Sequence, residues 1–316
     1  MTMPASVLLR HDHVPAGDGL AELRHAAQDL LGRESCRLTP LRLRPKVADE
    51  TQKFLVRAPS SNAQPLGLIE WSVAAAPNEA SRAARRAEEA RSVLGPVLGE
   101  PVVVPRHLGT FAGRSATIAP FHGDWTPLPV LRRLQRQRAV REALGWHLAV
   151  VRHTARVVTP REVEDEFQWP LRRLAAHPAV STAVRAAAAQ ALDDLDAGRW
   201  TPSLALWHGD FWHGNLMRPL AGARYRMAVI DWGGARRAGP GIYDTLCMAD
   251  SVGMTPGALR VELDRHADAL QCAPAHVGGH ALASLGWLSR HLGEWPVARF
   301  VEKCDRVLGL LRAARG

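Results

Sequence analysis

The sequence has few of the features that mark secreted or membrane-spanning proteins. No run of about 18 apolar residues is present, so we expect no membrane-spanning helix. The first residues lack a long apolar stretch followed by a small-residue cleavage pattern, so we also expect no signal peptide. The four cysteines are scattered without the paired spacing of a metal site or a disulfide framework. We therefore expect reduced thiols in a cytoplasmic protein. The cysteines are Cys36, Cys247, Cys272 and Cys304.

Lysine is also scarce, because it occurs only at positions 46, 53 and 303. The 40 basic residues are therefore almost all arginine, and they outnumber the 31 acidic residues to give a formal net charge of +9. This balance favours anionic ligands in general. The chain has no basic run interleaved with aromatic residues and no recognisable nucleic-acid module. We expect an arginine-rich solvated surface and no nucleic-acid partner.

A chain of 316 residues is long enough for two lobes, each with its own core. Its first third alternates apolar runs with turn-rich pieces, which predicts strands joined by loops and one helix among them. Residues 1–35 are expected to form an N-terminal extension with a helix at 19–31. The strands are expected at residues 36–43, 52–58, 66–73, 102–111 and 115–119, and the helix at 78–94.

Helical spacing dominates from residue 128 onwards. Helices are expected at 128–158, 163–175, 179–197 and 256–270, and as a pair within 280–311. The change of character near residues 119–125 predicts a hinge between a lobe at 36–120 and a larger lobe at 121–316. We expect an α+β fold with a five-stranded antiparallel small lobe and a mainly helical large lobe.

Two short apolar runs in the helical part each lead into polar side chains. Residues 204–207 precede HGDFWHGN, which places Asp210 five residues before Asn215. Residues 227–230 precede Asp231. Phosphoryl transfer needs one carboxylate to accept the proton of the attacking hydroxyl, and an amide with a second carboxylate to hold magnesium. An isolated Asp after a strand is otherwise a common turn former or helix cap.

The segments HGDFWHGN (208–215), VIDW (229–232) and GPGIYDT (239–245) resemble, in order and spacing, the signature of the aminoglycoside phosphotransferase and choline kinase-like family. The resemblance runs from about residue 36 to the end. It implies a bilobal protein-kinase-like fold and a kinase that transfers the γ-phosphate of ATP or GTP to a hydroxyl group. The acceptor would be a sugar, amino alcohol, antibiotic or other metabolite, with Mg²⁺ as cofactor. We expect a monomer or homodimer.

The resemblance also implies roles for single residues. Asp210 corresponds to the catalytic base, and Asn215 and Asp231 correspond to the magnesium ligands. Trp212 either packs the loop or stacks on an acceptor ring. His213 stands where the family usually has proline, and either packs or touches substrate. Three residues are expected to support the loop without taking part in the chemistry: His208, Asp244 and His153.

The small lobe departs from the family pattern. The turn RPKVADET (44–51) has no glycine to cover the phosphates, and the strand at 66–73 has no lysine to bind them. Lys53 or Arg57 on the neighbouring strand is predicted to supply that charge, although arginine and lysine differ in phosphate geometry. A second alignment makes residues 52–58 the third strand, which brings Arg57 close to the lysine position.

The best helix glutamate for the nucleotide clamp is Glu89, with Glu88 one step away, and both are otherwise members of an exposed Arg/Glu face. Glu70 or Trp71 falls near the place where the family has its lysine. An altered clamp leaves two further hypotheses beside the active kinase. One is a catalytically weak or inactive kinase-like binding protein. The other is a small-molecule-binding partner protein that uses the cleft without ATP.

The acceptor is expected to be neutral or anionic rather than polycationic. The acidic residues at 162–166 and 193–196 are small groups within a basic chain, and the alternative is that they are solvated helix faces. Tryptophans supply flat apolar surface for an acceptor pocket or for the core. The candidates in the helical lobe are Trp169, Trp200, Trp287 and Trp295.

Overall fold

The structure, a computed structural model, describes residues 19–41, 51–59, 64–72, 79–123, 125–126, 128–292 and 296–316. The chain forms two compact units. The first comprises Met1–Arg85 and Val104–His122, and the second comprises Arg86–Val103 and Gly123–Gly316.

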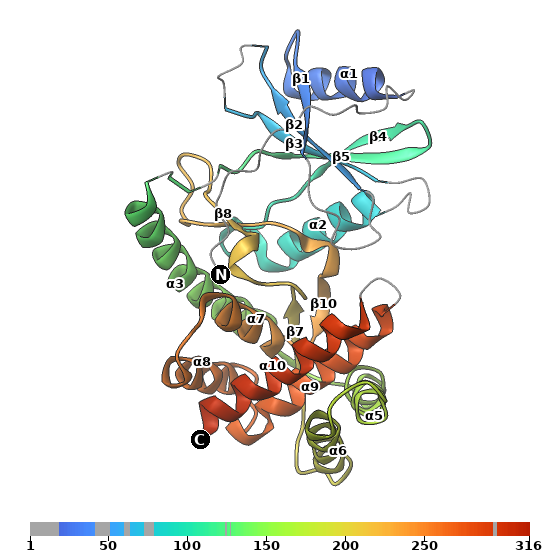
Figure 1. The fold of residues 1–316 in the computed structure, drawn as a ribbon, viewed down its shortest axis with the longest axis vertical. Helices are drawn as coiled ribbons and strands as arrows, with labels where there is room; N and C mark the ends of the chain where they lie inside the picture. The colour runs from blue at the N-terminus through green and yellow to red at the C-terminus, as the bar shows by residue number, and fades with distance from the viewer. Residues whose placement is uncertain are drawn as a thin grey trace. The chain divides into compact units, whose positions relative to one another are not determined.

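The first unit is built on a five-stranded antiparallel sheet, as predicted, with the order β1-β2-β3-β5-β4 (Figure 1). Helix α1 (Leu20–Leu31) shares a core with one face of this sheet through Leu23, Phe54 and Trp71. Side chains alternate along a strand, so Lys53 and Glu70 lie on the opposite face. The strands are β1 (Arg37–Leu41), β2 (Gln52–Arg57), β3 (Gly67–Trp71), β4 (Arg106–Phe111) and β5 (Arg114–Pro120).

One prediction near this sheet is corrected. Residues 102–104 were expected to begin the fourth strand, but Val102 forms a parallel bridge with Val229 in the second unit. Pro105 separates this bridge from β4, because proline cannot donate to a strand ladder. The helix expected at 78–94 lies within α2 (Glu79–Leu98), and a kink at Gly95 (φ 68°, ψ −173°) breaks the helical backbone where the sequence predicted the helix to end. The proposed cap Asn78 lies outside the described residues.

The second unit is mainly helical, and its apolar core joins most of the helices. The predicted helices are confirmed with shifted ends and two further differences. Residues 156–157, expected at the end of the first helix, form a strand, and a π-helical turn (Glu164–Gln168) interrupts the helix expected at 163–175. Helix α6 begins at Thr182 because the Ser181 hydroxyl accepts from the Val184 amide. Among the described residues, no helix is both long and apolar enough to cross a bilayer. The α-helices are α3 (Pro129–Thr154), α4 (Pro160–Val163), α5 (Trp169–Ala175), α6 (Thr182–Asp196), α7 (Ile242–Val252), α8 (Pro256–Ala269), α9 (Val277–Leu288) and α10 (Val297–Arg315).

Short strands inside the second unit carry the polar motif. The fully buried β7 (Ser203–Trp207) pairs antiparallel with β6 (Arg156–Val157) and β10 (Arg236–Gly239), and β7 and β10 lie side by side in Figure 1. A second pair joins β8 (Leu216–Met217) to β9 (Ala228–Val229). The segment 208–215 therefore runs from the end of β7 to the start of β8, and Asp231 follows β9.

Candidate active site

The segment after β7 is fixed by one buried carboxylate. Asp244, on α7, is 0% exposed and accepts hydrogen bonds from the His208 amide (2.7 Å) and the Gly209 amide (3.0 Å), one on each oxygen. Charge-assisted bonds of this kind are stronger than neutral ones. Gly209 has φ 84°, and a Cβ there would lie 3.0 Å from the Gly234 carbonyl. The turn therefore requires glycine, and Asp244 holds its backbone in place.

His208 continues this support on the other side of the loop. Its Nε2 lies 3.0 Å from the Ile230 carbonyl, which can only accept, so Nε2 carries the proton. Its Nδ1 is then free to accept the Asp210 amide at 3.2 Å. The His208 ring thus links the loop, through the Asp210 amide, to Ile230, the residue before Asp231.

Asp210 and Asn215 are brought into direct contact. The Asn215 Nδ2 donates to the Asp210 backbone carbonyl (2.8 Å) and to the Asp210 Oδ2 (3.1 Å). Both amide hydrogens face Asp210, which leaves the Asn215 Oδ1 as an oxygen ligand. Asp210 itself is half-buried, so its carboxylate is held by a neighbour yet still reachable.

Asp231 is tied to the same loop through the backbone. The Ile230 amide donates to the Asn215 carbonyl (3.1 Å), and β8 and β9 pair Leu216 with Val229. Asp231 has φ 64° and ψ 59°, the left-handed region that non-glycine residues rarely adopt. Its side chain is exposed, and within the described chain it has no hydrogen-bond or ion-pair partner.

The residues present fit a magnesium ion. Mg²⁺ prefers hard oxygen ligands and commonly takes one or two protein carboxylates, with phosphates and water completing the shell. The Asn215 Oδ1 and the unpaired Asp231 carboxylate are oxygen donors of this kind. Within the described ranges there is no cluster of three or more His, Cys, Asp or Glu side chains placed for a metal. A magnesium ion held by one or two protein carboxylates needs fewer protein ligands than such a cluster contains.

The aromatic residues of the segment 208–215 differ in burial and in the groups that they contact. Phe211 is fully buried, and its ring centre lies 5.8 Å from that of Trp146 and 5.0 Å from that of His147, on which it stacks, so it anchors the loop to α3. The half-buried Trp212 lies over Gly214, where a Cβ would come within 2.3 Å of the ring. The His213 amide donates to the Ser251 hydroxyl, and burial lowers the pKa of its ring.

His153 was expected to support the catalytic loop, and the structure places it elsewhere. It is exposed near the end of α3, where its Nε2 contacts the Val93 carbonyl at 3.3 Å. The α3 histidine that approaches Asp244 is His147, whose Nε2 lies 3.8 Å from the Asp244 Oδ2. His147 lies six residues earlier on the same helix, and no motif in the sequence marked it.

His147 belongs to a buried polar group beneath the loop. Its Nδ1 lies 3.1 Å from the His266 Nε2, and the Thr245 hydroxyl lies within 3.3 Å of both rings. The His266 Nδ1 must donate to the Glu262 carbonyl (2.7 Å), so its Nε2 accepts when the ring is neutral. Burial lowers the pKa of His266 to about 3, which keeps that ring neutral. The sequence did not predict this group, because its two histidines lie on different helices, α3 and α8, and no local sequence pattern connects them.

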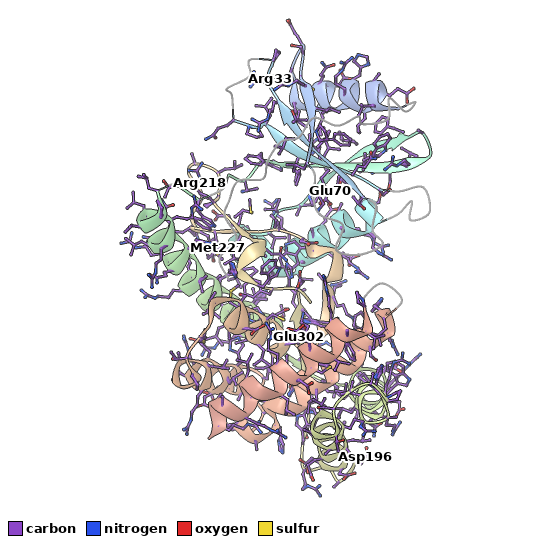
Figure 2. All side chains as sticks on the ribbon, viewed as in Figure 1. Arg33, Glu70, Asp196, Arg218, Met227 and Glu302 are labelled. Carbon is purple, nitrogen blue, oxygen red and sulfur yellow. The ribbon has the colours of Figure 1, made fainter. Side chains whose placement is uncertain are left out.

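The residues predicted for the nucleotide clamp are divided between the two units. Lys53 on β2 forms an ion pair with Glu70 on β3 (2.5 Å), and both side chains are 27% exposed. Figure 2 marks Glu70 on the sheet of the first unit. Arg57 ends the same strand as Lys53. Glu89 and Glu88 are exposed on the part of α2 that belongs to the second unit. Most of the turn at 44–51 lies outside the described residues.

Ion pairs use several of the acidic residues considered for the acceptor. Glu162 binds Arg156 and caps α4, and Glu166 binds Arg236 through two hydrogen bonds of 2.7 and 2.5 Å. Arg236 also lies 4.5 Å from the centre of the Trp287 ring. These contacts leave less uncompensated negative charge for a cationic acceptor.

The four candidate tryptophans have different surroundings. Trp169 carries the Arg290 guanidinium 3.8 Å from its ring, whereas Trp200 is 3% exposed and packs in the core. Trp287 lies against Trp207, with ring centres 5.2 Å apart, and Trp207 directly precedes the segment 208–215. Trp295 lies outside the described residues.

Comparisons with known proteins identify the fold. No protein-family model matches the chain, and no curated protein matches it in sequence. Among solved structures, it is similar to a thermostable mutant of aminoglycoside phosphotransferase APH(4)-Ia, with 16% identity, a TM-score of 0.55, and coverage of 93% of this chain and 99% of that one. A putative fructosamine-3-kinase from Haemophilus somnus shares 9% identity (TM-score 0.52, 92% and 96% covered). LicA, solved with AMP, shares 12% identity (TM-score 0.52, 93% and 97% covered). The protein-kinase-like fold predicted from the sequence is confirmed.

Proposed function

We propose that the protein is a small-molecule kinase that transfers the γ-phosphate of ATP or GTP to a hydroxyl group of a small metabolite. The observation that carries this proposal is the Asp210–Asn215 contact, held on one loop by Asp244 and tied through Ile230 to Asp231. Structures of this fold solved with ADP, GDP or AMP support a nucleotide as co-substrate. We further propose a cytoplasmic protein that acts as a monomer or homodimer.

Asp210 is the proposed catalytic base. The Asn215 amide fixes one of its carboxylate oxygens, which leaves the other to accept the proton of the acceptor hydroxyl. Proton transfer of this kind typically contributes about 10²- to 10⁴-fold in rate. Asn215 and Asp231 would hold Mg²⁺, which when bound neutralises phosphate charge and orients the nucleotide. Asp244, His208 and His147 keep these groups in register without touching substrate.

The acceptor is proposed to be a neutral or anionic hydroxylated metabolite, such as a sugar, an amino alcohol or a natural product. The net charge of +9 and the ion pairs that use Glu162 and Glu166 support this class over a polycationic drug. Lys53, with Arg57 and Glu89 as further members, is the proposed replacement for the phosphate-binding lysine.

One contact favours a second candidate function. The charge of Lys53 is balanced by Glu70, so its attraction for phosphate is weaker than that of an unpaired lysine. A kinase-like protein that binds ligands and turns over slowly or not at all would have such a clamp. This candidate shares the fold and differs only in turnover.

The test is a screen of hydroxylated metabolites and antibiotics for ATP- or GTP-dependent phosphorylation, read by mass spectrometry, with Asp210→Asn as the diagnostic variant. We expect transfer by the wild type and a loss of about 10²- to 10⁴-fold in the variant, because the base is removed while the shape is kept. Asp264→Asn is the matched control, since Asp264 is an exposed carboxylate on α8 paired with Arg260. Nucleotide binding without transfer would favour the second candidate, and unchanged transfer in Asp210→Asn would refute the base assignment.

A further inference from the structure

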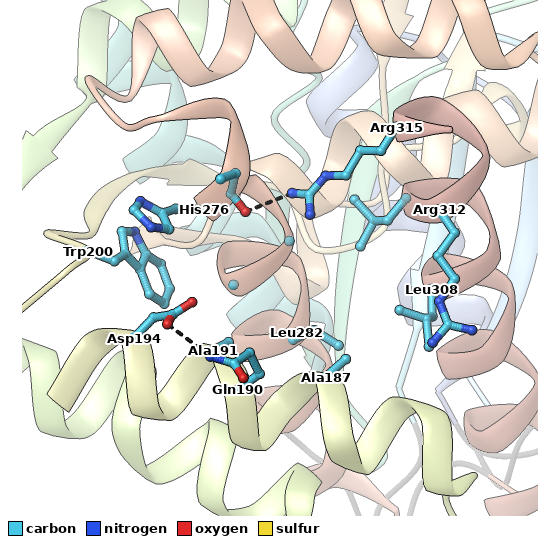
Figure 3. Close-up of a pocket in the computed structure, with 14 residues that line it drawn as sticks. Ala187, Gln190, Ala191, Asp194, Trp200, His276, Leu282, Leu308, Arg312 and Arg315 are labelled. Atoms are coloured by element: carbon cyan, nitrogen blue, oxygen red, sulfur yellow. Dashed lines mark hydrogen bonds between the residues drawn. The ribbon is translucent and has the colours of Figure 1, made fainter. Parts of the chain in front are cut away.

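A cavity of about 290 Å³ lies between α6, α9 and α10 in the second unit. It approaches the lower end of small-molecule sites, which begin near about 300 Å³. Figure 3 shows Arg312 and Arg315 extending from α10 on one side, and Trp200, His276 and Asp194 on the opposite side.

The cavity is separate from the catalytic loop. Trp200 precedes β7, and the Ser203 amide at the start of that strand donates to His280 on α9. Asp210 follows the other end of β7. A strand rises about 3.3 Å per residue, so the five residues of β7 separate the two places by about 16 Å. A molecule in the cavity therefore does not present its hydroxyl to Asp210.

Small residues on facing helices keep the space open. Ala187 and Ala191 lie four residues apart on α6, so they share one face. Gly278 and Gly279 face the cavity from α9. At Gly279 a Cβ would come within 2.6 Å of the Trp200 ring, so glycine is needed for this ring to pack here. The opening thus follows from side-chain size along two helices.

The charge of the cavity wall is positive. Arg312 is exposed, and its guanidinium has no hydrogen-bond or ion-pair partner within the described part of the chain. Arg315 uses its Nη2 to bind the Pro274 and Ala275 carbonyls (3.1 and 2.9 Å), which leaves its other donors. Asp194 is the acidic residue of the wall, and Arg199 binds it through 3.0 and 2.7 Å contacts. The arginines are therefore not neutralised from within the cavity.

The opposite wall is aromatic. Trp200 and His276 stack with ring centres 6.1 Å apart and planes 29° apart. Trp200 is 3% exposed, so the half-buried His276 ring supplies most of the aromatic surface that a molecule in the cavity can reach.

We propose that this cavity is a second ligand site, which takes a small anion attached to a flat ring, such as an aromatic carboxylate. The anion lies at Arg312 and Arg315, and the ring packs towards Trp200 and His276. Gln190 on α6, which donates to Asp194, lies on the same wall and adds a polar group for ring substituents. The site does not depend on the proposed kinase activity.

Benzoate is the test ligand, titrated into the full-length protein by isothermal titration calorimetry. We expect saturable binding that weakens about tenfold in Arg312→Gln, because a charge-assisted contact is lost. Ala191→Leu fills the cavity and should abolish binding. Arg299→Gln is the control, since Arg299 is an exposed arginine on α10 outside the cavity and its loss changes net charge equally. Asp210→Asn should bind benzoate as the wild type does.

Two comparisons test the ring and the location. Cyclohexanecarboxylate has the same charge without an aromatic ring and should bind several-fold more weakly. Equal weakening by Arg299→Gln and Arg312→Gln would mean general attraction to a basic protein, which overturns the site. No saturable binding of benzoate, or binding that Ala191→Leu leaves unchanged, would overturn it as well. Circular dichroism of Ala191→Leu confirms that a loss of binding is not a loss of fold.

Discussion

At the scale of single residues, Asp231 combines function with strain. A residue with a side chain usually avoids the left-handed region, and such conformations cost on the order of 1 kcal/mol or more where the surroundings impose them. At Asp231 the imposing contacts are the Ile230 bonds to Asn215 and His208. Aspartate tolerates this region better than most residues, because its short polar side chain bonds locally. The strain is consistent with a carboxylate kept there for its chemistry.

Substitution at Asp231 should therefore separate stability from activity. Asp231→Gly relieves the strain but enlarges the unfolded ensemble, so the free energy of unfolding should stay equal or rise by up to about 1 kcal/mol. Magnesium-dependent phosphoryl transfer should fall by at least about 10²-fold in the same variant, because the carboxylate is gone. Urea denaturation and transfer assays measure the two effects.

Asp231→Asn is the matched variant, because asparagine also accepts the left-handed region and keeps the side-chain volume. It should unfold like the wild type and lose transfer. A loss of stability of several kcal/mol in Asp231→Gly would show that the Asp231 side chain holds the fold, which contradicts the reading of a strained functional residue.

At the scale of elements, α9 depends on a histidine that must stay neutral. His280 is fully buried; its Nε2 accepts the Ser203 amide (3.3 Å), and its Nδ1 lies 3.4 Å from the His276 carbonyl. If the His280 Nε2 were protonated, two hydrogen-bond donors, this N–H and the Ser203 N–H, would face each other and the hydrogen bond would be lost. Burial accordingly lowers the pKa of His280 to about 4, from an ordinary value of 6.5.

This depression predicts acid sensitivity with a defined window. Above pH 6.5 the ring is neutral in both the folded and the unfolded chain. Below pH 6.5 His280 binds a proton in the unfolded chain, whereas in the folded chain it stays neutral down to about pH 4. The free energy of unfolding therefore decreases as pH falls through this range. The slope is at most about 1.4 kcal/mol per pH unit for one proton. His266, with its pKa lowered to about 3, contributes a second such proton to the pH dependence of stability, over the range from pH 6.5 down to about pH 3.

Urea unfolding at pH 7.5, 6 and 5 measures this slope. His280→Asn should lower stability at every pH through lost packing, but it should also flatten the pH dependence by up to about one proton. His25→Gln, at an exposed position on α1, is the control and should leave the slope unchanged. An unaltered slope in His280→Asn would show that this histidine does not carry the effect.

The same elements show what the sequence could and could not predict. The strands β2 and β3 were predicted at 52–58 and 66–73 from apolar runs bounded by turn residues, and α6 was predicted at 179–197 from helical spacing. Helix α7 was not predicted from periodicity, because its residues 242–249 are all buried and show no polar face. Residues 102–104 looked like a strand of the first sheet, yet Val102 and Val103 pair with Val229 of β9, which no local pattern specifies.

At the scale of the whole molecule, the proposed catalytic and magnesium-binding residues were easier to predict than the residues that hold their loop in place. Asp210, Asn215 and Asp231 lie at fixed spacings after short strands, so their order alone indicated a phosphoryl-transfer set. His147 reaches Asp244 only because α3 and α7 pack together, and the contact joins residues 97 positions apart in sequence. The phosphate clamp was uncertain for a related reason: Lys53 and Glu70 meet through strand register, which the sequence did not determine.

The response of the whole chain to nucleotide decides between an active kinase and an inactive binder with an altered clamp. A ligand that binds only the folded state stabilises it by about 2.7 kcal/mol at 100 times its dissociation constant. Saturating Mg²⁺ and ATP should therefore raise the melting temperature of the wild type by several degrees. The rise should shrink in Asp231→Asn, which lacks a proposed metal ligand, and in Lys53→Gln, which lacks the proposed phosphate cation.

Glu70→Gln provides the opposing variant. It removes the carboxylate that balances Lys53 and leaves the lysine in place, so a lysine that binds phosphate should bind it more tightly and enlarge the shift. Arg106→Gln, at an exposed position on β4 of the same sheet, controls for the loss of one surface charge. If Mg²⁺ and ATP, or Mg²⁺ and GTP, produced no shift in any of these proteins, nucleotide binding and the kinase proposal would both be wrong. A shift in the wild type that Lys53→Gln and Glu70→Gln leave untouched would retain the kinase and remove Lys53 from its phosphate clamp.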